Sequence, residues 1–264
     1  MKKIVIPTDF SEIAKNAAQF AISIARHTGA ELIFFHADLH RESDELRKLK
    51  EETAKVSLSN PAVKTGFIVS DKLFNSLTIK DIFNNSVDLI IIGTSGEKAD
   101  ISKKLFGTNT SEIIEDINCA VISIPADCHY KDIQKIAYAS DLSKLDHEVA
   151  KVIDFARLFN AIIEVFHVSP VFPDLGDVEK MDVHSKIEQL KHEHGYSAIK
   201  YFVEETSHDN QIDKGIKSFL LHHQSDLLVL FHNNVEGIDR FISSSETEKS
   251  VSQIKTPLLI FPKV

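Results

Sequence analysis

The sequence is poor in cysteine. Its 264 residues include two, Cys119 in an apolar run and Cys128 in a segment that resembles a linker. A single pair of cysteines is not the disulfide framework of a small secreted protein, so a reducing compartment is the simpler interpretation.

Long apolar runs are missing as well. The two lysines behind Met1 precede only a very short apolar run, which ends at Pro7, whereas a secretory signal requires a longer one. No apolar stretch approaches the roughly 20 residues that span a bilayer. We therefore expect a cytoplasmic protein that makes no contact with membranes.

An excess of basic residues is also absent. The chain has 30 Lys and Arg against 39 Asp and Glu, which gives a formal net charge of -9. Because phosphate-rich partners select for Lys and Arg, this balance argues against nucleic acid and anionic membranes as partners. The chain does have a globular composition, with 43% hydrophobic and 26% charged residues.

The most informative feature is an internal repeat, in which residues 3–36 align with residues 135–167. A repeat of this length is a duplicated domain rather than a solenoid unit. The sequence therefore predicts two domains, residues 1–126 and residues 135–264, with the boundary between them at residues 126–134. The matched positions and segments are Asp9 and Asp141, Ser11 and Ser143, His36 and His167, 87–92 and 225–230, and 119–125 and 256–262.

Each copy alternates short apolar runs with helical patterns. Ser11 is suited to cap a helix, and Gly29 supplies its end. Apolar runs predict strands at residues 3–6, 31–36, 64–69, 88–92 and 120–124, and helical spacing predicts helices at residues 13–25, 41–56, 77–83 and 110–117. Because the strands are apolar throughout, we expect burial on both faces of a parallel sheet. The predicted fold class is α/β, with two tandem, doubly wound, parallel five-stranded sheets and helices on both faces.

Open sheets of this class bind ligands beyond the carboxyl ends of their strands. In the first copy, residues 7–11 and residues 93–108 (GTSGEKADISKKLFGT) follow strands one and four. Glycines let backbone N–H groups approach an anion, and a following helix N-terminus adds unsatisfied donors, so the second segment suits a di- or triphosphate. The alternative is that these glycines only turn a tight loop and relieve crowding. Neither G-x-x-x-x-G-K-[ST] nor G-x-G-x-x-G occurs, so the nucleotide classes that those motifs mark have no support.

Several segments taken in order resemble the universal stress protein family. They are residues 4–11 (IVIPTDFS), residues 88–92 running into Gly93-x-x-Gly96, Gly107-Thr108, and residues 119–125 (CAVISIP). The resemblance covers essentially the whole chain as two tandem copies. It implies an adenine nucleotide alpha hydrolase-like fold and a stress-response role.

The resemblance also implies a pocket for ATP or a related adenine nucleotide in the first copy, and it leaves open whether Mg²⁺ accompanies the ligand. Asp9 would contact the base or sugar, and Pro7 and Thr8 would form the pocket wall at that end. Ala37 would contact the base through its backbone. The residues that would line the pocket or meet the ribose and phosphates are Ile92, Gly93, Gly96, Gly107, Thr108 and Asn109. Ten residues separate Gly96 from Gly107, one more than the family's nucleotide-binding members usually have.

The second copy departs further from this pattern. Residues 231–237 read FHNNVEG, without G-x-x-G, and residues 241–247 read FISSSET where Gly107-Thr108 should recur. Without glycine the backbone cannot approach phosphate as closely. We therefore predict that the second copy binds no ATP.

Thirteen histidines invite a metal hypothesis, which their spacing does not support. We predict no metal site, and for His36 and His167, at matching strand ends, a packed or hydrogen-bonded role. No paired carboxylate or Ser-His-Asp signature marks a catalytic residue.

The favoured function is a nucleotide-responsive regulatory or interaction protein. The alternatives are a slow ATP hydrolase and an interaction protein whose nucleotide site is vestigial. By resemblance to single-copy relatives, residues 120–124 and 257–261 would pair edge to edge as an intrachain pseudo-dimer. A further homodimer is left open.

Overall fold

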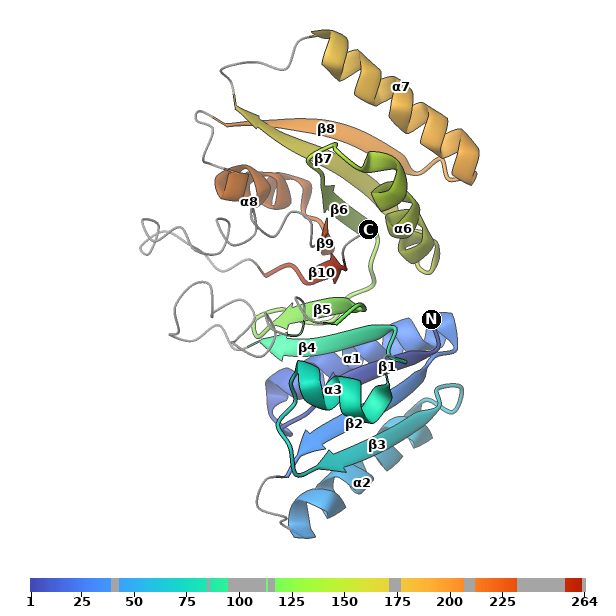
Figure 1. The fold of residues 1–264 in the computed structure, drawn as a ribbon, viewed down its shortest axis with the longest axis vertical. Helices are drawn as coiled ribbons and strands as arrows, with labels where there is room; N and C mark the ends of the chain where they lie inside the picture. The colour runs from blue at the N-terminus through green and yellow to red at the C-terminus, as the bar shows by residue number, and fades with distance from the viewer. Residues whose placement is uncertain are drawn as a thin grey trace. The chain divides into compact units, whose positions relative to one another are not determined.

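The computed structural model describes residues 1–38, 43–84, 86–94, 113, 117–170, 177–206, 212–231 and 255–262. The chain divides into two compact units. The first consists of Met1–Tyr130 with Ile260–Pro262, and the second is Lys131–Leu259. The two units have the same order of described strands and helices along the chain (Figure 1).

The first unit holds a parallel sheet in the strand order β3-β2-β1-β4-β5. In Figure 1, α3 lies on one face of this sheet and α1 and α2 lie on the other. The elements are β1 (Lys3–Pro7), α1 (Glu12–Thr28), β2 (Glu31–Ala37), α2 (Ser43–Ser59), β3 (Thr65–Ser70), α3 (Ser76–Phe83), β4 (Leu89–Thr94) and β5 (Ala120–Pro125). The predicted α/β class is confirmed.

The centre of this unit is β1, which lies between β2 and β4. Ile4, Val5 and Ile6 are fully buried, because a central strand covered on both faces exposes neither side. The ends of α1 follow the sequence prediction. The Ser11 side chain accepts a hydrogen bond from the N–H of Ala14, and Gly29 ends the helix with a φ of 69°.

The second unit repeats this plan with the strand order β10-β9-β6-β7-β8. Its elements are β6 (Lys135–Ala139), α6 (Leu145–Arg157), β7 (Ile162–Pro170), α7 (Asp177–His194), β8 (Ile199–Thr206), α8 (Ile212–His223), β9 (Leu227–Phe231) and β10 (Leu258–Phe261). No helix among the described residues combines the length and apolarity needed to cross a membrane.

One hydrogen-bond pattern appears in both units. The carboxylate of Asp88, before β4, accepts bonds of 2.8 and 2.9 Å from the N–H groups of Lys2 and Lys3. The carboxylate of Asp226, before β9, accepts two bonds of 2.9 Å from the N–H groups of Gln134 and Lys135. An aspartate at the equivalent position therefore fixes the start of the first strand in each unit, which agrees with an ancestral duplication.

The first unit differs from the sequence prediction at its outer strand. Apolar strands were predicted to be buried on both faces, yet Phe67 and Val69 of β3 are 39% and 37% exposed. The reason is that β3 lies at the end of the strand order and has β2 as its neighbour on one side. The predicted helix at residues 110–117 lies outside the described residues except at Ile113 and Ile117, which are joined by a helical hydrogen bond of 3.0 Å.

Candidate functional site

The sheet of the first unit has a point at which its connections diverge. From β1 the chain runs outward to β2 and β3, and it returns to place β4 on the other side of β1. The carboxyl ends of β1 and β4 therefore lie side by side where the direction of the connections reverses. Ligands of open α/β sheets bind at such a place, which we call the switch point.

Six of the predicted site residues lie at this edge of the sheet. Pro7 ends β1, Thr8 and Asp9 follow it, Ala37 ends β2, and Ile92 and Gly93 belong to the carboxyl half of β4. The strand registers place β1 between the other two. The structure thus brings these residues to one end of three adjacent strands. The other four, Gly96, Gly107, Thr108 and Asn109, lie outside the described residues.

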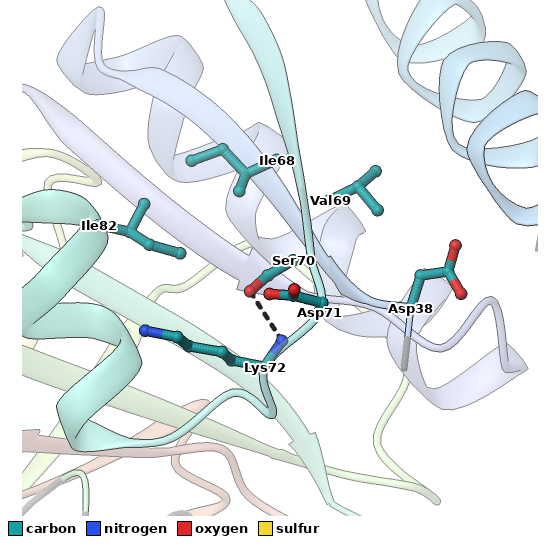
Figure 2. Close-up of a pocket in the computed structure, with 7 residues that line it drawn as sticks. All are labelled: Asp38, Ile68, Val69, Ser70, Asp71, Lys72 and Ile82. Atoms are coloured by element: carbon teal, nitrogen blue, oxygen red, sulfur yellow. Dashed lines mark hydrogen bonds between the residues drawn. The ribbon is translucent and has the colours of Figure 1, made fainter. Parts of the chain in front are cut away.

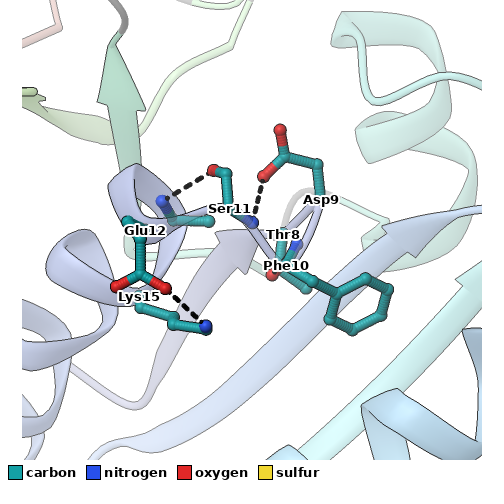
Figure 3. A network of polar contacts seen from close by, with 7 residues as sticks. Thr8, Asp9, Phe10, Ser11, Glu12 and Lys15 are labelled. Atoms are coloured by element: carbon teal, nitrogen blue, oxygen red, sulfur yellow. Dashed lines mark hydrogen bonds and ion pairs between the residues drawn. The ribbon is translucent and has the colours of Figure 1, made fainter.

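The loop after β1 is held by its own side chains (Figure 3). The hydroxyl of Thr8 accepts a 3.1 Å bond from the N–H of Phe10, and the carboxylate of Asp9 accepts a 3.0 Å bond from the N–H of Ser11. Phe10 has a φ of 64°, which is uncommon for a residue other than glycine. The two side-chain hydrogen bonds, from the N–H of Phe10 to Thr8 and from the N–H of Ser11 to Asp9, offset the cost of that backbone conformation and define the position of the loop.

The Asp9 side chain is exposed at the end of this loop. Its partial burial raises the pKa of the carboxyl, but the hydrogen bonds from Ser11 outweigh that effect, so the pKa lies below its ordinary value. Asp9 is therefore a carboxylate at neutral pH. It can accept hydrogen bonds from hydroxyl or amino groups, and its charge repels phosphate.

The end of β2 supports the same loop. Nδ1 of His36 lies 2.8 Å from the carbonyl oxygen of Thr8, and the N–H of Thr8 donates a 2.8 Å bond to the carbonyl of Phe35. The ring of Phe10 packs on the His36 ring at a centroid distance of 4.6 Å. The predicted packed and hydrogen-bonded role of His36 is confirmed.

Gly93 has a packing reason to be glycine. A Cβ atom at this position would lie 2.6 Å from Cγ2 and 2.8 Å from the carbonyl oxygen of Ile13 in α1. The missing side chain thus lets the first turn of α1 approach β4 closely. This contact accounts for Gly93 without a ligand, and it also fixes the distance between the two elements that border the switch point.

The described part of the first unit also contains an open pocket of about 600 Å³ beside the predicted site (Figure 2). Asp38, which directly follows Ala37, lines it, and the backbone of Asp38 is joined to β3 by a 2.8 Å bond to the carbonyl of Ser70. The sequence analysis did not predict this pocket. The polar residues that follow the second and third predicted strands, Asp38 and Asp71, could have indicated it. The full lining is Asp38, Ile68, Val69, Ser70, Asp71, Lys72 and Ile82.

The second unit repeats the loop geometry almost atom for atom. The hydroxyl of Ser140 accepts a 3.0 Å bond from the N–H of Leu142, and Asp141 accepts a 2.9 Å bond from the N–H of Ser143. Leu142 has a φ of 67°, and Nδ1 of His167 lies 2.8 Å from the carbonyl oxygen of Ser140. The loop is therefore a property of the duplicated fold and does not by itself distinguish a binding unit.

The two units differ in the residue near the carboxyl end of the fourth strand. The registers of β1 with β4 and of β6 with β9 place Phe231 at the position of Gly93. Phe231 is fully buried, and its ring lies 5.6 Å from that of Tyr138. An aromatic ring thus occupies the second unit where the first has a glycine.

A buried polar network accompanies Phe231. The Tyr138 hydroxyl donates a hydrogen bond to Glu148 of α6 and lies 3.0 Å from the hydroxyl of Ser140. Burial raises the pKa of the Glu148 carboxyl and that of the Tyr138 hydroxyl. The other carboxyl oxygen of Glu148 has no hydrogen-bond partner among the described residues. These side chains support the loop after β6 from within the core.

The remaining candidate chemistry is limited among the described residues. They include no group of three or more His, Cys, Asp or Glu side chains arranged to hold a metal ion. Cys119 and Cys128 are both buried, and neither forms a disulfide. Burial, with a contribution from the Asp88 carboxylate, raises the pKa of the Cys119 thiol to about 12, so this thiol is not a nucleophile at neutral pH.

Comparison with known proteins gives consistent matches. The model of the universal stress protein family matches residues 1–61 and 132–262. A universal stress protein of Methanocaldococcus jannaschii is 27% identical in an alignment 139 residues long that covers 47% of this chain and 81% of that protein. The crystal structure of a universal stress protein from Archaeoglobus fulgidus has a TM-score of 0.66 and 14% identity, over 99% of this chain and 96% of that one.

The same fold also occurs in a different setting. The cytoplasmic domain of a prokaryotic cation chloride cotransporter matches with a TM-score of 0.56 and 8% identity, over 98% of this chain and 94% of that one. Fold similarity alone therefore does not assign an activity, which has to be argued from the site.

Proposed function

Because the chain belongs to the universal stress protein family, we propose that it is a cytoplasmic stress-response protein whose first unit binds ATP or a related adenine nucleotide. The nucleotide would bias the partner choice or conformation of the protein. The observation that carries this proposal is the ordered loop after β1, which places the Asp9 carboxylate at the switch point beside the ends of β2 and β4.

Charge favours one orientation of the ligand. The described end of the site holds the carboxylate of Asp9 and, in the adjoining pocket, Asp38 and Asp71 with one cation, Lys72, which is already paired with Asp81 at 3.0 Å. The three carboxylates suit the ribose hydroxyls and the amino group of adenine, and they oppose phosphate. The phosphates would therefore lie toward the glycine-bearing segment, at Gly96, Gly107, Thr108 and Asn109.

The nature of Asp9 favours binding over catalysis. A hydrolase needs a positioned water and stabilisation of the charge that develops on the transferred phosphoryl group. Asp9 has a lowered pKa and is committed to the turn through Ser11, so it is a poor proton carrier near neutral pH. Slow hydrolysis, with or without Mg²⁺, remains the second candidate function.

The second unit would bind no nucleotide. Its loop is intact, but Phe231 fills the position of Gly93 and the Tyr138–Glu148 pair lies beneath. The role left for this unit is structural. We propose that its last strand pairs with that of the first unit as an intrachain pseudo-dimer.

Calorimetric titration of the full chain with ATP, ADP and AMP, with and without Mg²⁺, tests the proposal. We expect saturable binding of one nucleotide per chain. A flat titration with all three ligands would refute the nucleotide site and leave the fold assignment intact. Measuring phosphate release in the same samples separates the two candidate functions, because sustained turnover would favour the hydrolase.

A further inference from the structure

The outer strand of the first unit, β3, is open on one side. Among the described residues β3 is hydrogen-bonded to β2, and the strand order ends at β3. An unpaired strand edge is a template for pairing with another chain, and native proteins usually protect such edges with charged residues, proline or a covering segment.

The backbone register shows which groups face outward. The N–H of Leu32 donates to the carbonyl of Lys64, and that of Asp38 donates to the carbonyl of Ser70, both at 2.8 Å. Backbone groups alternate in direction along a strand, so the even-numbered residues of β3 face β2. The N–H and C=O groups of Thr65, Phe67 and Val69 therefore point away from the sheet.

The duplicated unit provides an internal reference for this edge. Its outer strand β8 pairs with β7 in a register that aligns Thr65 with Ile199. On that alignment Gly66 and Ser70 of β3 correspond to Lys200 and Glu204 of β8. The edge of β8 thus carries charged residues of the protective kind, whereas β3 (TGFIVS) carries none.

Apolar side chains are exposed around β3 as well. Phe67 and Val69 are more than one-third exposed, and Leu73 and Leu77, in the segment that follows, are 53% and 67% exposed. In Figure 2, Ile68 and Val69 point to opposite sides of the strand, so apolar groups are present on both faces of this edge. Clustered exposed apolar residues beside an open strand mark an interaction surface.

We propose that β3 pairs with β3 of a second copy of this chain, antiparallel and about a twofold axis at Phe67. In this register Phe67 faces Phe67 of the second copy, and Thr65 faces its Val69. All outward backbone groups of Thr65, Phe67 and Val69 then find partners in both chains. On the other face Ile68 lies opposite Gly66 of the second copy, which leaves room for the larger side chain.

The symmetry of the strand favours a second copy over an unrelated peptide. The three outward residues are centred on Phe67, so self-pairing satisfies both edges at once and closes the assembly as a dimer. Pairing of β3 with β8 would instead generate open fibres and would place the uncharged edge against Lys200 and Glu204. Val69 also lines the pocket beside the proposed nucleotide site, so the surface is tested by the oligomeric state of the protein and not by ligand binding.

Matched substitutions in the two units test the surface. Val69 and Val203 occupy equivalent positions on β3 and β8, so Val69→Lys and Val203→Lys add the same charge to the two edges. By sedimentation velocity we expect the unchanged protein and Val203→Lys to be dimers and Val69→Lys to be a monomer. The proposal is overturned if the unchanged protein is a monomer at every accessible concentration, if Val69→Lys remains dimeric, or if Val203→Lys also dissociates.

A cross-link tests the register and does not depend on a disruptive charge. Hydrogen-bonded antiparallel partners have Cα atoms about 5.5 Å apart, which is within the range of a disulfide. Mild oxidation of Phe67→Cys should therefore give a covalent dimer on a non-reducing gel, whereas Val69→Cys, which faces Thr65 of the second copy, should give little. Equal cross-linking of both variants, or none in Phe67→Cys, would contradict the register.

Discussion

Nδ1 of His36 lies 2.8 Å from the carbonyl oxygen of Thr8. This bond ties the end of β2 to the loop after β1, and it fixes the loop that presents Asp9. The equivalent bond between His167 and Ser140 has the same length. The two loops can therefore be perturbed identically, which separates effects on folding from effects on a ligand.

Replacing each histidine makes that separation. His36→Ala and His167→Ala should each lower the free energy of unfolding by roughly 1–3 kcal/mol, because each removes a hydrogen bond and the packing of a ring that is buried at His36 and partly buried at His167. Only His36→Ala should also weaken nucleotide binding. Chemical denaturation and calorimetry measure the two effects, and an equal loss of affinity in His167→Ala would contradict the assignment of the site to the first unit.

Substituting the loop aspartates tests the charge at the site. Asn can retain the turn through its amide oxygen but lacks the negative charge, so Asp9→Asn should leave stability nearly unchanged. We expect nucleotide affinity to fall about tenfold, the scale of one charge-assisted hydrogen bond. Asp141→Asn is the matched control, and unchanged affinity in Asp9→Asn would remove Asp9 from the site.

The contact between β4 and α1 predicts a packing cost. Gly93→Ala should destabilise the protein by about 1–3 kcal/mol, because its Cβ would overlap the backbone of Ile13. Gly66→Ala is the control, since a Cβ there would meet its nearest atom at an ordinary 3.7 Å. Thermal or urea unfolding of both variants measures the difference. Equal stability of the two would show that α1 adjusts freely.

Glu148 predicts a dependence of stability on pH. Burial raises its pKa in the folded protein above the ordinary value of 4.5, so folding favours the protonated form. Its favourable contribution is fully present below pH 4.5 and is lost as the pH rises through the raised pKa. Glu148→Gln should therefore be the more stable protein at neutral pH, and the gap should close in acid.

Denaturant titrations across this pH range measure that gap. Glu12→Gln, at an exposed position at the start of α1, controls for general effects of charge. A constant difference between Glu148→Gln and the unchanged protein at all pH values would contradict the proposed titration.

The buried thiol of Cys119 predicts low reactivity. With its pKa raised to about 12, the thiol carries almost no thiolate at neutral pH and is also inaccessible. A chromogenic thiol reagent should label Cys119 slowly in the folded protein and rapidly after denaturation, with peptide mass spectrometry to identify the site. Fast labelling of Cys119 under native conditions would show that β5 opens readily.

The sequence was sufficient to predict the order of elements, because strands buried on both faces and an amphipathic helix leave strong periodic signals. The capped ends of α1 at Ser11 and Gly29 were predictable for the same local reason. The positive φ of Phe10 was not, since it depends on turns and on packing against His36, a residue distant in sequence.

The site was predictable only in part. Asp9 and Gly93 could be placed at one edge of the sheet because they follow predicted parallel strands, and Ala37 was implied by the family resemblance. The approach of Ile13 to Gly93 could not be predicted, because it depends on how α1 packs on β4. The Tyr138–Glu148 pair was missed for a similar reason, since a buried acid has no sequence signature until its partner is known.

The ring of Phe231 has a consequence for stoichiometry. A symmetric pair of single-domain chains offers two equivalent sites, and such sites can communicate. If only the first unit binds nucleotide, as proposed, the chain offers a single site, and its two halves cannot produce a sigmoidal binding curve. In that case any cooperativity must arise between chains and must vary with protein concentration.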